Sequence, residues 1–148
     1  MNDETWTRHS NPWSGWTRVS ILPLFCLAIW SRVWLGWYCL WLVLIVAIWT
    51  WVNPRFFGPP KHENAWMTKG VLGERIWLAK SENPIPAHHL RVGKLLLFAS
   101  GIAAIILIYG LWRLDFGWTI AGLIGTMGAK LWFVDRMVWL LADMRPQS

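Results

Sequence analysis

Histidine is the residue type in this chain best suited to metal binding or acid–base chemistry. Of the four histidines, three lie between residues 53 and 94: His62, His88 and His89. Glu63 follows His62, so the same stretch holds the imidazole and carboxylate groups that zinc and iron sites use. Neighbouring residues in a helix point about 100° apart, so His88 and His89 are expected to face different ways. The sequence therefore predicts no metal site and leaves these four side chains as the alternative ligand set.

Known catalytic patterns are absent from the rest of the sequence. There is no phosphate-binding loop, no Ser-His-Asp order and no pair of carboxylates within the apolar stretches. A small chain of this kind is expected to be a non-catalytic accessory or structural subunit, packed against a larger membrane-protein complex or its own copies. The alternative is an enzyme, or a binder of a hydrophobic ligand or cofactor, that works at the membrane interface through the histidine-containing loop. The first interpretation needs no cofactor.

Four tryptophans recur at spacings of four, three and four residues: Trp30, Trp34, Trp37 and Trp41. In one helix this spacing places all four rings on a single face. Such a face could hold a lipid, carotenoid, quinone or tetrapyrrole, or it could dock onto a partner protein. The other interpretation is an aromatic belt at the membrane surface. No histidine lies within the apolar runs, so a haem or chlorophyll would lack its usual axial ligand there.

The first apolar segment, residues 19–52, is too long for one membrane crossing. A helix rises about 1.5 Å per residue, whereas the hydrocarbon core is only about 30 Å thick. Its one charged residue, Arg32, would lie near the middle of the bilayer, at a cost of several kcal/mol. A turn at residues 31–36 solves both problems and predicts a hairpin of two spans.

The second apolar segment, residues 95–134, is divided in the same way by Arg113 and Asp115. Its last span carries small residues four apart, a pattern that lets two helix backbones approach closely in lipid. These predicted packing residues are Gly117, Ala121, Gly125 and Ala129.

The remaining segments carry helix signals of their own. Asn11 before Pro12 is typical of a helix start, and Pro23 should kink the helix that follows. Residues 64–80 are expected to form a helix lying on the membrane surface, with Asn64 as its N-cap. Its apolar face would be Trp66, Leu72, Ile76 and Ala79, with Gly70 and Gly73 weakening it. The next helix is expected to begin near Ala87.

Composition and charge agree with a membrane protein. Of 148 residues, 55% are hydrophobic, and 15 are tryptophan. Of 14 Lys and Arg residues, only Arg32 and Arg113 fall in the two turns. The positive-inside rule then places both termini and the central loop in the cytoplasm, with the turns outside. This distribution explains the net charge of +6 without a nucleic-acid partner.

The predicted fold is therefore all-α, with four transmembrane helices in two hairpins, in the prokaryotic cytoplasmic (inner) membrane. The expected segments are an N-terminal cytoplasmic or interfacial segment (1–18), a first transmembrane hairpin (19–52), a cytoplasmic loop with an interfacial helix (53–94), a second transmembrane hairpin (95–134) and a C-terminal cytoplasmic tail (135–148).

Three stretches carry a resemblance to a known family: Arg8 to Ser14, Lys69 to Arg75 and Lys130 to Trp139. They resemble an uncharacterised family of small, Trp-rich prokaryotic integral membrane proteins. The resemblance implies a membrane protein and brings with it no activity and no catalytic residues. The chain is also similar in size and composition to the tetrapyrrole-binding translocator-protein family, but it lacks that family's motifs and five spans.

Overall fold

The computed structural model describes residues 3–60, 62, 64–81 and 84–145, and every regular element in these ranges is a helix. The all-α prediction is thus confirmed. In chain order the elements are α1 (Asp3–His9), α2 (Pro12–Val19), α3 (Ile21–Trp30), α4 (Arg32–Leu35), the 3-10 helix η1 (Gly36–Tyr38), α5 (Cys39–Phe56), α6 (Trp66–Leu78), α7 (Ala87–Arg113) and α8 (Phe116–Met144).

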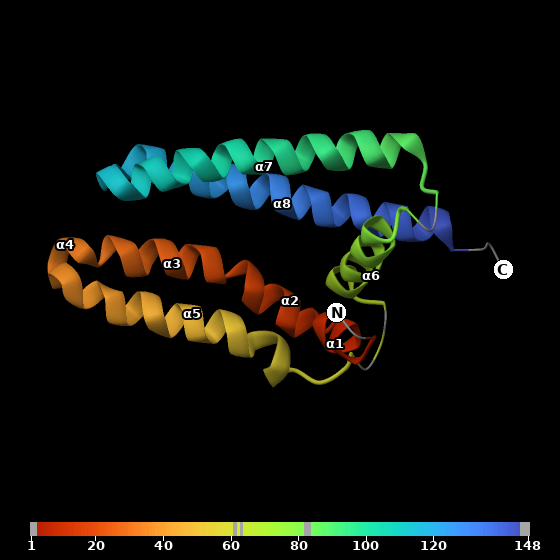
Figure 1. The fold of residues 1–148 in the computed structure, drawn as a ribbon, viewed down its shortest axis with the longest axis horizontal. Helices are drawn as coiled ribbons and strands as arrows, with labels where there is room; N and C mark the ends of the chain where they lie inside the picture. Colours follow the sequence, from red (N-terminus) through yellow and green to blue (C-terminus); the bar gives the residue numbers. More distant parts are fainter. Residues whose placement is uncertain (1–2, 61, 63, 82–83, 146–148) are drawn as a thin grey trace.

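Two antiparallel helix pairs make up most of the molecule, α3 with α5 and α7 with α8 (Figure 1). Their turns lie at the same end. The opposite end, called the base from here on, holds α1, α2, α6 and the last turns of α8. The hydrophobic core lies at this base, between α6, α7 and α8. Its buried members are Trp77, Ile85, Leu96, Phe133, Met137 and Leu140.

The first hairpin turns through α4 and η1, where the sequence predicted a turn. Gly36 ends α4 with φ +53°, a backbone conformation that glycine adopts without steric cost. Asn11 caps α2 as expected, because its side chain accepts a hydrogen bond from Trp13 N at 2.9 Å. The helix then breaks at Ser20, between α2 and α3. Pro23 explains this position, since proline has no N–H and its ring clashes with the carbonyl four residues earlier.

The second hairpin turns at Leu114 and Asp115. Leu114 takes a left-handed conformation with φ 53°, and Asp115 caps α8 by accepting a hydrogen bond from Trp118 N at 3.0 Å. Below the turn the two backbones touch. A Cβ atom added at Gly110 would overlap the backbone of Thr119, and one at Gly122 would overlap that of Leu107.

This contact corrects the predicted packing face of the second hairpin. Of the four predicted small residues, Gly125 does face α7, since an added Cβ would lie 2.9 Å from the Ala103 Cβ. Gly117 and Ala121 are exposed, and Ala129 is half-buried. The closest approach is instead made by Gly122, beside the buried Thr119. The four-residue spacing pointed to the right helix but placed the contact at the wrong angle around it.

The central helix α6 crosses α8 and packs against it (Figure 1). The closest contacts between α6 and α8 are made at Gly70 and Gly73, the two glycines that were expected to weaken the helix. An added Cβ at Gly70 would overlap the Val134 side chain, and one at Gly73 would overlap the Met137 backbone. The helix predicted over residues 64–80 is found at Trp66–Leu78, and its N-cap is Ala65 rather than the predicted Asn64. Its placement on the membrane surface stays a prediction. Its buried apolar residues are Met67, Val71 and Trp77, not the predicted face. The prediction that the following helix begins near Ala87 is confirmed.

Two helical runs in the described ranges are long and apolar enough to cross a membrane. One is Pro12–Asn53, which includes the turn of the first hairpin, and the other is Ala87–Arg113. Length and composition thus support two candidate membrane spans. The helix α8 is not one of these two candidate spans, because four glycines and Lys130 lower its mean hydropathy.

Candidate functional site

The structure brings His88 and His89 together, although adjacent helix positions were expected to face apart. Their ring centroids are 4.2 Å apart, and both rings turn toward Asp143 near the end of α8. The distance to Asp143 Oδ2 is 2.8 Å from His89 Nε2 and 3.9 Å from His88 Nε2. One ligand atom from each of the three side chains lies within 4.8 Å of the others. The expectation of divergent rings is therefore wrong, and Asp143 was missed because it lies in the segment assigned to a polar tail.

The rest of the alternative ligand set does not join this cluster. His62 is exposed and lines a separate hollow of about 370 Å³ with Pro12, Trp13 and Ala65. Glu63 lies outside the described residues. His89 is 1% exposed and its Nδ1 atom has no hydrogen-bond partner among the described residues. The hydrogen bond from His89 to Asp143 joins the start of α7 to the end of α8, so its evident role is to hold the two helix ends together.

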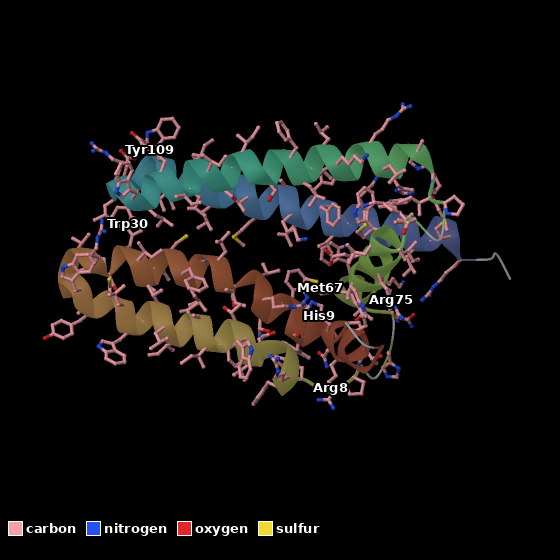
Figure 2. The ribbon with its side chains drawn as sticks, in the orientation of Figure 1. Arg8, His9, Trp30, Met67, Arg75 and Tyr109 are labelled. Carbon is pink, nitrogen blue, oxygen red and sulfur yellow. The ribbon has the colours of Figure 1, made fainter. Side chains whose placement is uncertain are left out.

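The four tryptophans of the predicted face do not share a helix. Trp30 lies in α3, Trp34 in α4, Trp37 in η1 and Trp41 in α5. Gly36 turns the chain between the second and the third, so the prediction of a single helix face is wrong. Trp30 is half-buried and points to the second hairpin (Figure 2), where its Nε1 donates a hydrogen bond to Thr119 Oγ1 at 3.3 Å. The other three are exposed, Trp34 and Trp37 at 77% and Trp41 at 66%.

A cavity of about 310 Å³ at the base is the candidate binding site that sequence reasoning missed. It lies where α1 and α2 meet α6 and α8, near His9 and Met67 in Figure 2. A second hollow of about 160 Å³ adjoins it between the hairpins. The two share their lining at Arg18, Val19, Lys130 and Leu131.

Charged side chains from three helices meet in this cavity. Lys130 Nζ lies 3.3 Å from Glu74 Oε1, an ion pair between α8 and α6. Arg18 donates from Nε to Ser14 O at 3.1 Å and from Nη2 to His9 O at 2.8 Å, and its Nη1 contacts His9 Nε2. These contacts hold the guanidinium in one place at the wall of the cavity.

His9 completes the charge balance of the cavity. Burial is the main cause that lowers the pKa of His9 from 6.5 to about 4, with the Arg18 guanidinium adding to the shift and Glu74 opposing it. At neutral pH the imidazole is therefore uncharged and can accept a hydrogen bond from Arg18. Among the described residues that line the cavity, two cations, Arg18 and Lys130, then face one carboxylate, Glu74, which gives this lining one net positive charge.

The sequence carried only a partial signal for this site. Arg18 lies just before the first apolar segment and Lys130 near the end of the second, so the sequence shows each as a charge at a segment boundary. Their meeting depends on α6, which brings Glu74 and the apolar wall of Met67 and Val71 between them. No local pattern in the sequence reports that crossing.

Together, these features define a small all-α protein with two membrane-length apolar helices and a cationic cavity at its base. The chain belongs to DUF6653, a family of unknown function, whose family model matches residues 1–148. The expected membership of an uncharacterised family is confirmed over the whole chain. Neither a curated protein nor a solved structure matched it.

Proposed function

We propose that this chain is a non-catalytic integral membrane protein that crosses the prokaryotic inner membrane four times and packs against a larger membrane complex. In this arrangement α3, α5, α7 and α8 are the spans. The base faces the cytoplasm and the two turns face outward.

The observation that carries the proposal is the low burial of the most apolar helices. In the most apolar windows of Pro12–Asn53 and Ala87–Arg113, only 6% and 17% of residues are buried inside the chain. A core helix of a water-soluble protein is largely buried, because exposed apolar area costs about 25 cal/mol per Å². Lipid or another protein covering these surfaces removes that cost.

The asymmetry of α5 supports a protein partner at the first hairpin. Between Leu40 and Val52 no side chain of α5 is buried, and only a narrow row is half-buried: Val43, Val46, Trp49 and Val52. Exposed aromatic residues such as Trp41 and Trp51 offer the large, rigid area that is common in protein interfaces. We therefore assign docking to the outward face of α5 and the adjoining turn.

Native-gel electrophoresis of membranes solubilised in mild detergent tests this function. The wild-type protein should migrate within a complex larger than itself. Replacing Trp37 and Trp41 by Leu keeps the hairpin apolar, so insertion should persist while co-migration is lost. The matched control replaces two equally exposed tryptophans of the second hairpin, Trp112 and Trp132, and should co-migrate as wild type.

Three outcomes would contradict docking of the first hairpin onto a larger complex. They are a wild-type protein that migrates alone, a band at the mass of two copies, and co-migration that survives the Trp37 and Trp41 replacements.

A further inference from the structure

The two hairpins touch at the turn end, and at the base α2, which leads into the first hairpin, contacts α6. At the turn end, Trp30 Nε1 bonds Thr119 Oγ1 at 3.3 Å, and Arg32 Nη2 donates to Trp112 O at 3.4 Å. At the base, Trp16 of α2 stacks on Trp66 of α6, with ring centroids 5.8 Å apart. Between these contacts lies the hollow of about 160 Å³. The space between the hairpins is thus bounded at both ends.

The two adjoining hollows differ in character along their length. The larger one, at the base, contains His9, Arg18, Glu74 and Lys130. The smaller one shares Arg18, Val19, Lys130 and Leu131 with it and runs toward the turns, where Leu22 and Met127 add apolar wall. One polar atom in this part, Thr126 Oγ1, is buried without a hydrogen-bond partner among the described residues. The two cations therefore lie where the hollows meet, and apolar wall extends from there toward the turns.

The charges around Arg18 and Lys130 would be balanced by a bound anion. Arg18 has five N–H donors, of which three are engaged by the Ser14 and His9 contacts. Among the described lining residues, Glu74 is the one carboxylate that faces the two cations. A partly buried cation without a counter-charge is costly, and hydrogen bonds between Arg or Lys and phosphate are among the stronger ones. The combined size, about 310 Å³ with the adjoining 160 Å³, suits a ligand headgroup and part of a chain.

From this arrangement we propose that the site binds one anionic phospholipid, with its phosphate between Arg18 and Lys130 and one acyl chain along the hollow between the hairpins. The lipid would fill the space between the hairpins and join α2 and α3 to α8. The inference rests on the proposed membrane placement, because only there does the hollow open to lipid.

Native mass spectrometry of the purified full-length protein, with added phosphatidylglycerol or phosphatidylcholine, tests the proposal. One phosphatidylglycerol should remain bound per chain, and phosphatidylcholine should bind more weakly. Lys130→Gln removes a charge from an exposed position and should lower phosphatidylglycerol retention about tenfold, as expected for one lost charged hydrogen bond. Lys94→Gln, an exposed cation of α7 outside the site, should bind as wild type.

A second pair of variants tests whether an acyl chain occupies the hollow between the hairpins. Leu22→Trp fills the hollow and should lower retention without changing charge, whereas Leu24→Trp, at an exposed position of the same helix, should not. Equal retention of the two lipids would overturn the proposal, as would wild-type retention in both Lys130→Gln and Leu22→Trp. Inorganic phosphate that raises the melting temperature as much as phosphatidylglycerol would reduce the site to an anion site and also overturn it.

The membrane placement is measured separately, by labelling. If Lys130→Gln and Leu22→Trp both insert normally and both retain lipid as wild type, the lipid inference alone is contradicted. Failure of insertion in the wild-type protein contradicts the proposed function instead.

Discussion

The two hairpins of this protein have the same outline and are held together in different ways. The helices α7 and α8 contain seven glycines, and two of them, Gly110 and Gly122, allow the backbones to touch. The helices α3 and α5 contain none. Their buried contacts are made by small side chains instead, Cys26, Ala28 and Cys39. The second hairpin also packs against α6, whereas much of α5 faces outward. One hairpin is thus a packed unit and the other a surface.

Polar anchors hold both hairpins where they leave the apolar region. Asn53, fully buried at the end of α5, accepts from Ser14 Oγ at 3.1 Å and donates to Thr17 Oγ1 at 2.7 Å. At the matching position of α8, Asp135 accepts from Trp66 Nε1 at 2.9 Å and from Trp139 Nε1 at 3.3 Å. The first anchor joins α5 to α2, and the second joins α8 to α6. The hairpins therefore differ mainly in how their helices contact each other along their length.

The largest expected effect comes from separating the second hairpin. Gly122→Leu places a side chain where the Leu107 backbone lies, so we expect loss of about 3 kcal/mol of stability or more. The melting temperature in detergent measures this. Gly128→Leu in the same helix is the control, because an added Cβ there meets nothing within 4 Å. Equal melting temperatures for the two variants would show that the helices are not in backbone contact.

An intermediate effect is expected from the anchor of the first hairpin. Asn53→Ala removes the acceptor of the Ser14 hydroxyl and the amide that donates to Thr17 Oγ1, at a cost of about 1–3 kcal/mol. The change should loosen the first hairpin alone. The buried thiols of Cys26 and Cys39 should then react faster with N-ethylmaleimide.

Two comparisons make the anchor experiment specific. A cysteine placed at the buried Leu107 of the second hairpin should keep its slow reaction. Asn64→Ala, at an exposed position, should leave all three thiols unchanged. If Asn53→Ala accelerates the thiol at position 107 as much as the other two, the hairpins are not independent.

The smallest effect concerns pH at the base. Since the pKa of His9 falls from 6.5 to about 4 on folding, the unfolded chain binds more protons between these values. The stability that His9 contributes is therefore fully present above pH 6.5 and is lost as the pH falls toward 4. We expect His9→Gln to flatten the fall in melting temperature between pH 7 and pH 5. His62→Gln, at an exposed histidine, should retain the wild-type slope, and an unchanged slope in His9→Gln would contradict the prediction.

Features set by neighbouring residues could be predicted from the sequence. The turn near Arg32, the cap at Asn11 and the helix start at Ala87 each depend on a few adjacent side chains. A kink was expected at Pro23, and the helix is interrupted at Ser20, because proline acts on the preceding turn.

Features that depend on rotation about a helix or on distant contacts could not be predicted. The prediction of a single tryptophan face was wrong because Gly36, with φ +53°, turns the chain between Trp34 and Trp37. The spacing of small residues in α8 predicted a contact face that includes Ala121. The backbone contact is made by Gly122, which lies about 100° further around the helix. The base cavity escaped prediction since its walls come from α1, α2, α6 and α8, and the crossing of α6 is fixed by glycines that locally disfavour a helix.

The central claim, four spans with the base in the cytoplasm, is tested most directly by labelling single cysteines. In a background with Cys26 and Cys39 replaced by Ala, new cysteines are placed at the turns, Trp37→Cys and Arg113→Cys, and at the base, Lys80→Cys and Arg145→Cys. A membrane-impermeant maleimide should label both turn positions in intact cells, and the base positions only after the membrane is permeabilised. Labelling of Lys80→Cys in intact cells, or of one turn position without the other, would contradict the account.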